Sequence, residues 1–221
     1  KNYEVGVELG FLKNRVNFEA TYYTQDNTDQ ILNIALSNTT GYNTLVANAG
    51  SFKNNGIELD LKLTPLVKIG QMSVDFKINY THQTNKITSL IDGTNELGIG
   101  NFNYAIVGKP VYTFKLTDYE RDPATGKVIV DATTGLPTIA SDLHTFGNTL
   151  PTDILGLNLN INFKGFTFGV TGEYRTGNQI VADQLGSFLD DNGISKRSAA
   201  NGRRAFVFPN SVYETAPGSG K

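Results

Sequence analysis

The chain has 221 residues, of which 39% are hydrophobic and 18% are charged, and both shares lie below those of typical globular domains. A net charge of −2 argues against a nucleic-acid partner, which needs a basic stripe, and the absence of cysteine excludes disulfide scaffolds and thiolate metal sites. No apolar run approaches the roughly 20 residues of a transmembrane helix, although the strands of membrane β-barrels give a much weaker signal.

The first predicted hairpin covers residues 2–24, where apolar and polar residues alternate. Period-two alternation is typical of a strand with one apolar face. A two-residue turn at Lys13-Asn14 pairs apolar residues with apolar residues, as the register of a hairpin requires. It also places Glu8 opposite Glu19, which is unfavourable for like charges. The expected apolar pairs are Phe11 with Val16, Leu9 with Phe18, Val7 with Ala20 and Val5 with Tyr22.

Two further hairpins are predicted over residues 56–81, with a turn at 64–70, and over residues 154–175, with a turn at Lys164-Gly165. Their strands run about 9–11 residues, the length that a tilted strand needs to cross a bilayer, whereas strands of soluble proteins average about 5–6. The hairpins therefore favour strands that span a membrane.

The connections between the hairpins are long and loop-like, over residues 25–54, 84–151 and 176–221. Outer-membrane barrels combine short periplasmic turns with long extracellular loops, so we expect the short turns on the periplasmic side. Within these loops we expect a small hairpin with Gly126 in a left-handed conformation, a plain turn rather than a calcium loop at Asp131–Gly135, and a short helix near Val181–Leu189.

The predicted fold class is all-β, with about six strands of a large antiparallel transmembrane β-barrel. The alternative is a secreted carbohydrate-binding β-sandwich or adhesin, whose apolar face would pack on a second sheet. Tyr22, Tyr23, Tyr80 and Tyr174 lie near the loop ends of their strands, where a membrane barrel has an aromatic girdle. Any one of them also suits a cross-strand position in an ordinary antiparallel sheet.

Several short motifs, in their order and spacing, resemble the SusC/RagA family of TonB-dependent outer-membrane transporters of Bacteroidetes. The motifs are Arg15–Tyr23, Thr28–Leu32, Thr40–Tyr42, Asn48–Gly50, Asn55–Leu59, Val107–Tyr112, Asp131–Pro137, Phe163–Phe166 and Phe206–Val212.

The resemblance implies a barrel of about 22 strands in the bacterial outer membrane, with an N-terminal plug, a segment that engages TonB, and a SusD-like surface lipoprotein as a lid. Residues 1–221 are then expected to be a later-middle segment of one barrel domain, with the plug domain absent and lipid around the wall. Family members import oligosaccharides or peptides for nutrient uptake, and the sequence does not choose between these substrates.

No catalytic, cofactor-binding or metal-binding residues are predicted, and we do not expect an enzyme. His82 and His144 have no partners at the spacing of metal ligands, and a β-rich hydrolase would need a paired carboxylate site. Aromatic rings in the long loops are the candidates for substrate binding, because sugars stack on such rings; the competing interpretation is packing against the lid or a neighbouring loop. The candidates are Tyr42, Phe102, Tyr104, Tyr112 and Tyr119.

Overall fold

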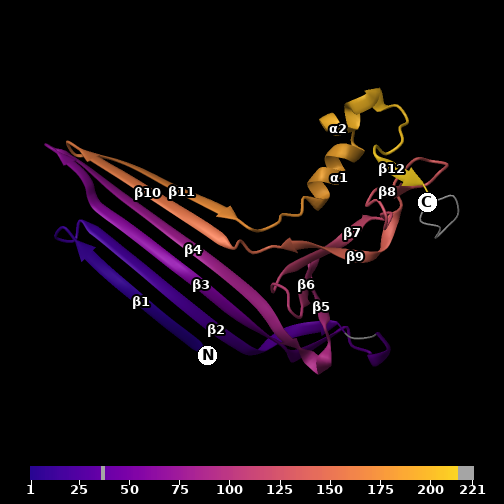
Figure 1. The fold of residues 1–221 in the computed structure, drawn as a ribbon, viewed down its shortest axis with the longest axis horizontal. Helices are drawn as coiled ribbons and strands as arrows, with labels where there is room; N and C mark the ends of the chain where they lie inside the picture. Colours follow the sequence, from indigo (N-terminus) through magenta and orange to yellow (C-terminus); the bar gives the residue numbers. More distant parts are fainter. Residues whose placement is uncertain (36–37, 214–221) are drawn as a thin grey trace. The chain divides into compact units, whose positions relative to one another are not determined.

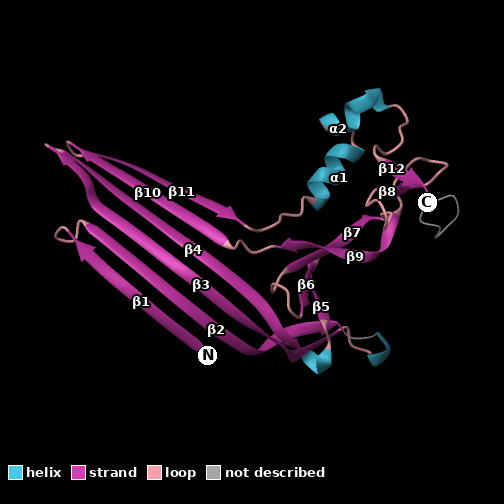
Figure 2. Cartoon of the chain, viewed as in Figure 1, coloured by secondary structure: helices cyan, strands magenta, loops and turns pink. Residues whose placement is uncertain are grey.

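The computed structural model describes residues 1–35 and 38–213 (Figures 1 and 2). The chain divides into two compact units. The first unit comprises Lys1–Phe114 and Gly147–Gln179, and the second comprises Lys115–Phe146 and Ile180–Lys221.

The first unit is built on an antiparallel six-stranded sheet in the order β1-β2-β3-β4-β10-β11. In Figure 2 its magenta strands lie side by side as one layer. The turns within the three hairpins lie at one end of the sheet, called here the turn end, and the opposite end is called the loop end. The strands are β1 (Asn2–Phe11), β2 (Val16–Ala35), β3 (Thr44–Ile69), β4 (Met72–Leu90), β10 (Asp153–Phe163) and β11 (Phe166–Thr176).

Shorter elements complete the two units. In the first unit β5 (Glu96–Gly100) pairs with β6 (Asn103–Ile106), which pairs with the start of β7 (Thr113–Tyr119). The 3-10 helices η1 (Asn38–Thr40) and η2 (Ile91–Gly93) also belong to it. The second unit contains β8 (Val128–Val130), most of β9 (Ile139–Asn148), α1 (Asp183–Asp191), α2 (Lys196–Ala199), η3 (Ala200–Arg203) and β12 (Ser211–Tyr213).

The hairpin registers agree with the predicted pairing. Phe11 lies opposite Val16 and Val5 opposite Tyr22, and the two predicted apolar pairs between them are also present. The Glu8 and Glu19 pair is present as well, and Glu19 lies opposite Asp60 on its other side. Three carboxylates thus share one row across three strands, a placement that water around this face makes tolerable.

The alternation gives the sheet an apolar face and a polar face. Side chains of the apolar face are not part of the buried core of the described residues. Val5 is 67% exposed and Phe168 61% exposed, and the order of the six strands leaves this sheet a single layer. A β-sandwich would bury these side chains under a second sheet. The apolar face comprises alternate residues from Tyr3 to Phe11, Val16 to Tyr22, Ile57 to Leu63, Met72 to Tyr80, Leu155 to Phe163 and Phe166 to Tyr174.

The loops are shorter than predicted, because the strands continue into them. β2 runs to Ala35 and β3 begins at Thr44, within the expected loop 25–54, and β4 runs to Leu90, within the expected loop 84–151. Apolar residues do occur in these extensions, such as Ile31, Val46 and Ile87, but they do not alternate regularly with polar ones, so the extensions carry no clear period-two signal. The turn expected over residues 64–70 is also shorter, since β3 continues through an irregularity between Leu63 and Val67 to Ile69.

The second unit confirms the local turn chemistry. Gly126 has φ +69°, and the segments that flank it pair through an Arg121–Val128 bridge. The carboxylate of Asp131 accepts the backbone N–H groups of Thr133 and Thr134, at 3.0 and 2.7 Å, and its carbonyl accepts the N–H of Gly135 at 2.8 Å, so these residues form the predicted turn. The predicted short helix is α1. None of the helices formed by the described residues has the length and apolarity of a membrane-crossing helix.

Candidate substrate-binding pocket

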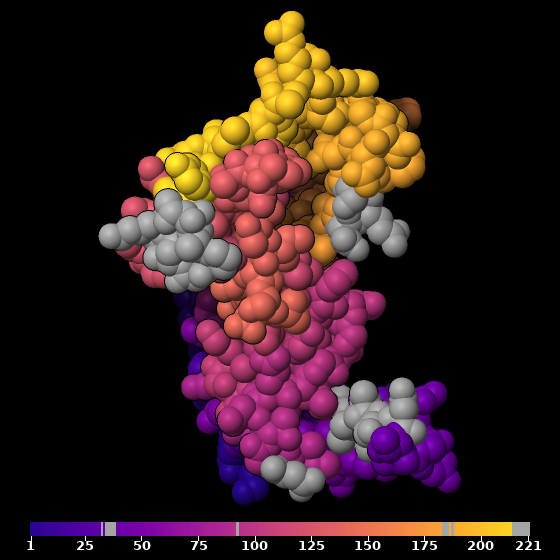
Figure 3. All heavy atoms as spheres, turned by 90° about the vertical axis from the view of Figure 1, so that its right-hand side faces the viewer, coloured from indigo at the N-terminus to yellow at the C-terminus, as the bar shows by residue number. Residues whose placement is uncertain are grey.

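A cavity of about 310 Å³ lies in the first unit, at the loop end of the polar face of β3 and β4. The β5–β6 hairpin and the chain that follows it complete its wall. Residues around 85–115, magenta to pink in the space-filling view, form one continuous surface at this end of the unit (Figure 3). The lining residues are Gln30, Gly50, Phe52, Asn54, Gln83, Thr84, Asn85, Ile87, Leu90, Ile99, Ala105, Val111, Tyr112 and Leu150.

Backbone pairing with β4 holds the segment Val107–Tyr112 in place. The Ile87 N–H donates to the carbonyl of Lys109 at 2.9 Å, and the Gly108 N–H donates back to the carbonyl of Ile87 at 2.9 Å. The Asn85 side-chain oxygen accepts the N–H of Val111 at 2.7 Å. Gly108 has φ +85°, a conformation that glycine adopts at little cost. These bonds bring residues more than twenty positions apart to the same wall.

The pocket has an apolar floor and an amide rim. Ile87, Leu90 and Ala105 are buried, at 4%, 8% and 2% exposed, and Phe52, Ile99 and Val111 pack against them. The rim carries amide side chains, and none of the lining residues is an Asp, Glu, Lys, Arg or His. Such a lining suits an uncharged apolar group, with hydrogen bonds to the amides at the edge. The amides are those of Gln30, Asn54, Gln83 and Asn85.

Among the five predicted aromatic residues, Tyr112 is the one that lines the pocket. Tyr104 lies on β6 opposite Gly98 and Thr113, and Phe102 lies in the β5–β6 turn with φ +62°. Tyr42 is 72% exposed and precedes β3. Tyr119 lies in the second unit, in an edge-to-face contact with Phe208 whose ring centroids are 5.5 Å apart. The pocket thus contains one of the five candidates, and substrate contact at each of them stays a prediction.

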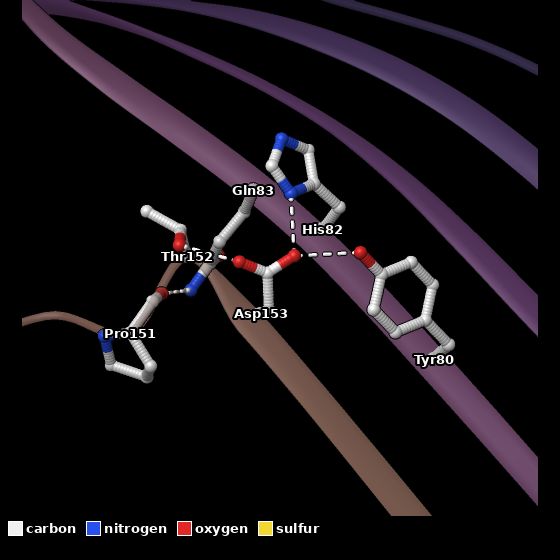
Figure 4. A network of polar contacts seen from close by, with 6 residues as sticks. All are labelled: Tyr80, His82, Gln83, Pro151, Thr152 and Asp153. Atoms are coloured by element: carbon white, nitrogen blue, oxygen red, sulfur yellow. Dashed lines mark hydrogen bonds and ion pairs between the residues drawn. The ribbon is translucent and has the colours of Figure 1, made fainter. Parts of the chain in front are cut away.

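A polar network that the sequence did not predict lies at the loop end of the apolar face (Figure 4). Asp153 Oδ1 accepts the hydroxyl of Tyr80 at 2.6 Å and lies 2.8 Å from His82 Nδ1. Thr152 Oγ1 donates to Asp153 Oδ2 at 2.7 Å. The sequence predicted no partners for His82 at the spacing of metal ligands and did not predict a single carboxylate partner from a distant strand. Pairing of β4 with β10 places Asp153 directly opposite His82. Among the described residues there is no group of three or more His, Cys, Asp or Glu that could hold a metal ion.

The tyrosines at the loop end divide between the two faces. Tyr22, Tyr80 and Tyr174 lie on the apolar face, opposite Ile57, Leu59 and Leu155 respectively. Tyr23 lies on the polar face, where a Cβ added to Gly56 would meet its ring at 2.4 Å. Its predicted place in the girdle is therefore wrong, because neighbouring residues of a strand point to opposite faces.

The family model described as TonB dependent receptor-like, beta-barrel, matches residues 1–188. The chain belongs to that family. A TonB-dependent receptor P39 from Formosa agariphila is 26% identical over 87 residues, which make up 39% of this chain and 8% of that protein.

Solved structures share the fold. The structure of the RagAB peptide transporter superimposes with a TM-score of 0.67 at 22% identity, and covers 80% of this chain and 20% of its own. The RagAB peptide importer in the closed-closed state has a TM-score of 0.65 at 24% identity, over 80% of this chain and 21% of its own. The chain thus spans about a fifth of these structures. The predictions of a SusC/RagA-like TonB-dependent receptor and of a partial all-β barrel are confirmed.

Proposed function

We propose that this chain forms part of the wall and of the loop-side mouth of a TonB-dependent importer in the bacterial outer membrane. Its strands cross that membrane several times. The apolar face lies against lipid, and the polar face lines the water-filled side of the barrel. The pocket carries this proposal, because it opens on the polar face at the loop end, where a substrate arriving from outside meets the wall.

Peptide is the substrate class that the pocket favours over oligosaccharide. An apolar floor of aliphatic side chains buries an apolar peptide side chain, and the amides of Asn54, Gln83 and Asn85 pair with the polar peptide backbone. Oligosaccharides bind through aromatic stacking and charged hydrogen-bond partners, and the pocket offers the rings of Phe52 and Tyr112 but no carboxylate. The RagAB structures described as a peptide transporter support the same choice.

The remaining partners follow from the family resemblance and lie within this proposal. A SusD-like surface lipoprotein acts as the lid over the loops, and TonB engages a part of the full-length protein outside residues 1–221. In this scheme the segment supplies a fixed wall and a substrate contact, and energy coupling belongs to the rest of the protein.

Filling the pocket tests the proposal in the full-length transporter. Ile99→Trp inserts a large ring into the cavity from β5, whereas the control Ile99→Leu keeps the volume and the apolar character. Loss of one buried apolar contact of about 1.5–3 kcal/mol predicts a fall of roughly 10- to 100-fold in affinity for a labelled peptide mixture. The leucine control should retain wild-type binding.

Equal peptide binding by the tryptophan variant and the wild type would show that substrate does not occupy this cavity. Loss of oligosaccharide uptake with peptide uptake preserved would replace peptide by oligosaccharide as the substrate class. Both substrates should therefore be measured in the same cells, with surface expression of each variant checked by antibody.

A further inference from the structure

Two lysines lie opposite each other above the loop end of the apolar face. β3 and β4 pair Ile57 with His82, Asn55 with Thr84 and Lys53 with Lys86. Since alternate residues share a face, Lys53 and Lys86 continue the apolar face beyond its last apolar row. Both lysines are exposed.

The network around His82 marks where the apolar face ends. His82 and Asp153 are the first polar residues of this face on β4 and β10, next to Tyr80 and Leu155, and Ile57 opposite His82 is the last apolar residue of the face on β3. Lys86 lies two rows beyond His82 on β4. Each row adds about 6.6 Å along a strand, and a tilt of about 40° reduces the rise to about 5 Å. The lysines therefore lie about 10 Å above the edge, within reach of the headgroup layer for their flexible side chains.

The charge of this pair is poorly compensated by the protein. Like charges at directly opposite positions destabilise a sheet. Lys53 has one distant partner, Asp26, at 3.9 Å, and both side chains are about half exposed. Lys86 forms no ion pair within the part of the chain that the structure describes. An anion between the two ammonium groups would relieve their repulsion.

The same two strands provide an internal comparison on the other face. Lys62 and Lys77 also lie opposite each other, but on the polar face. There Asp60 lies 3.3 Å from Lys62, and lipid does not reach that face in a barrel. The Lys62 and Lys77 pair therefore has a carboxylate 3.3 Å from one ammonium group. The carboxylate next to the Lys53 and Lys86 pair is farther away, at 3.9 Å from Lys53.

We propose that Lys53 and Lys86 bind the phosphate of an anionic lipid headgroup in the leaflet on the loop side. Phosphate oxygens accept charge-assisted hydrogen bonds from both ammonium groups, and a basic pair at this level is attracted by an anionic membrane surface. The acyl chains of the same lipid then pack along the apolar face below. This inference rests on the proposed placement of that face against lipid.

Native mass spectrometry of the full-length transporter in detergent tests the site, with dioleoyl phosphatidylglycerol as the probe. The double variant K53Q/K86Q should bind this lipid at least fivefold more weakly than the wild type. The matched double variant K62Q/K77Q should bind it with unchanged affinity, and dioleoyl phosphatidylcholine should show no difference among the three proteins. Inorganic phosphate should not compete, because the site takes its anion from a lipid anchored beside it.

Unchanged phosphatidylglycerol affinity in K53Q/K86Q, or equal losses in the two double variants, would overturn the site. Displacement of the lipid by inorganic phosphate would overturn the lipid as the source of the anion. A spin label at Leu159 in the same protein separates these results from failure of the proposed placement. Contact of that label with lipid keeps the placement even if the lysine site fails, and contact with water alone would reject both.

Discussion

Leu159 lies at the middle of the apolar run of β10, between Leu155 and Phe163, and pairs with Phe76 and Val170. It lies four positions from each end of that run, which is about 13 Å along the strand and about 10 Å of depth at a tilt of 40°. This position is close to the midplane of a band about 25 Å tall. An arginine there is expected to destabilise the folded barrel by about 2–4 kcal/mol.

Two matched variants separate a bilayer from a protein core. Leu155→Arg lies one row from Asp153, near the interface, and should cost about 0–1 kcal/mol. Asn160→Arg adjoins Leu159 on the polar face opposite Asp75, and should cost about 1 kcal/mol or less. Urea unfolding of the full-length protein in phospholipid vesicles, followed by heat-modified mobility on gels, measures all three. Equal destabilisation by Leu159→Arg and Leu155→Arg would refute a depth-dependent lipid environment.

Two further predictions concern packing and pH. Gly56→Ala should destabilise the barrel by about 1–3 kcal/mol, because the added Cβ would meet the ring of Tyr23 at 2.4 Å. The control Gly172→Ala should be neutral in the same urea assay, because nothing lies within 4 Å of its added Cβ. Equal effects of the two variants would contradict the contact with Tyr23. Backbone and side-chain hydrogen bonds from Thr134 lower the pKa of Asp131. Because the pKa is lowered in the folded state, ionised Asp131 stabilises the turn above the unfolded pKa of about 3.9, and this stabilisation is lost as the pH falls through the folded pKa. Pepsin cleavage at 131–135 should therefore accelerate with acidification in the wild type and be fast throughout in Asp131→Ala. A rate ratio between the two proteins that is constant with pH would contradict this coupling.

The hairpins were predictable because their pairing is decided by neighbours close in sequence. A slip of one residue would turn Phe11 and Val16 to the wrong face, so the apolar pattern determines the register. The same argument predicted even the unfavourable pair of Glu8 with Glu19. By contrast, where β2 and β3 leave the predicted hairpins, Asp26 and Lys53 lie opposite each other, as do Gln25 and Asn54, so regular alternation disappears while the backbone ladder continues.

The candidate site was less predictable because its parts come from distant segments. Tyr112 was expected as a substrate contact and does line the cavity. Ile87 and Leu90 lie in what resembled a loop, and only the return of the chain at Lys109 makes them a pocket floor. The contact of His82 with Asp153 joins residues that are 71 positions apart. A long connection separates them, so the sequence does not predict which residues of β4 and β10 lie opposite each other.

A cysteine scan along β10 in a cysteine-free background of the full-length transporter tests the central claim most directly. Residues 1–221 contain no cysteine, so spin labels at successive positions report each face in native membranes. Labels at Leu155, Leu157, Leu159 and Ile161 should be accessible to oxygen dissolved in lipid, and labels at Asn158, Asn160 and Asn162 to a water-soluble nickel complex. Accessibility without period two, or with the two faces exchanged, would contradict a barrel wall with its apolar face in lipid.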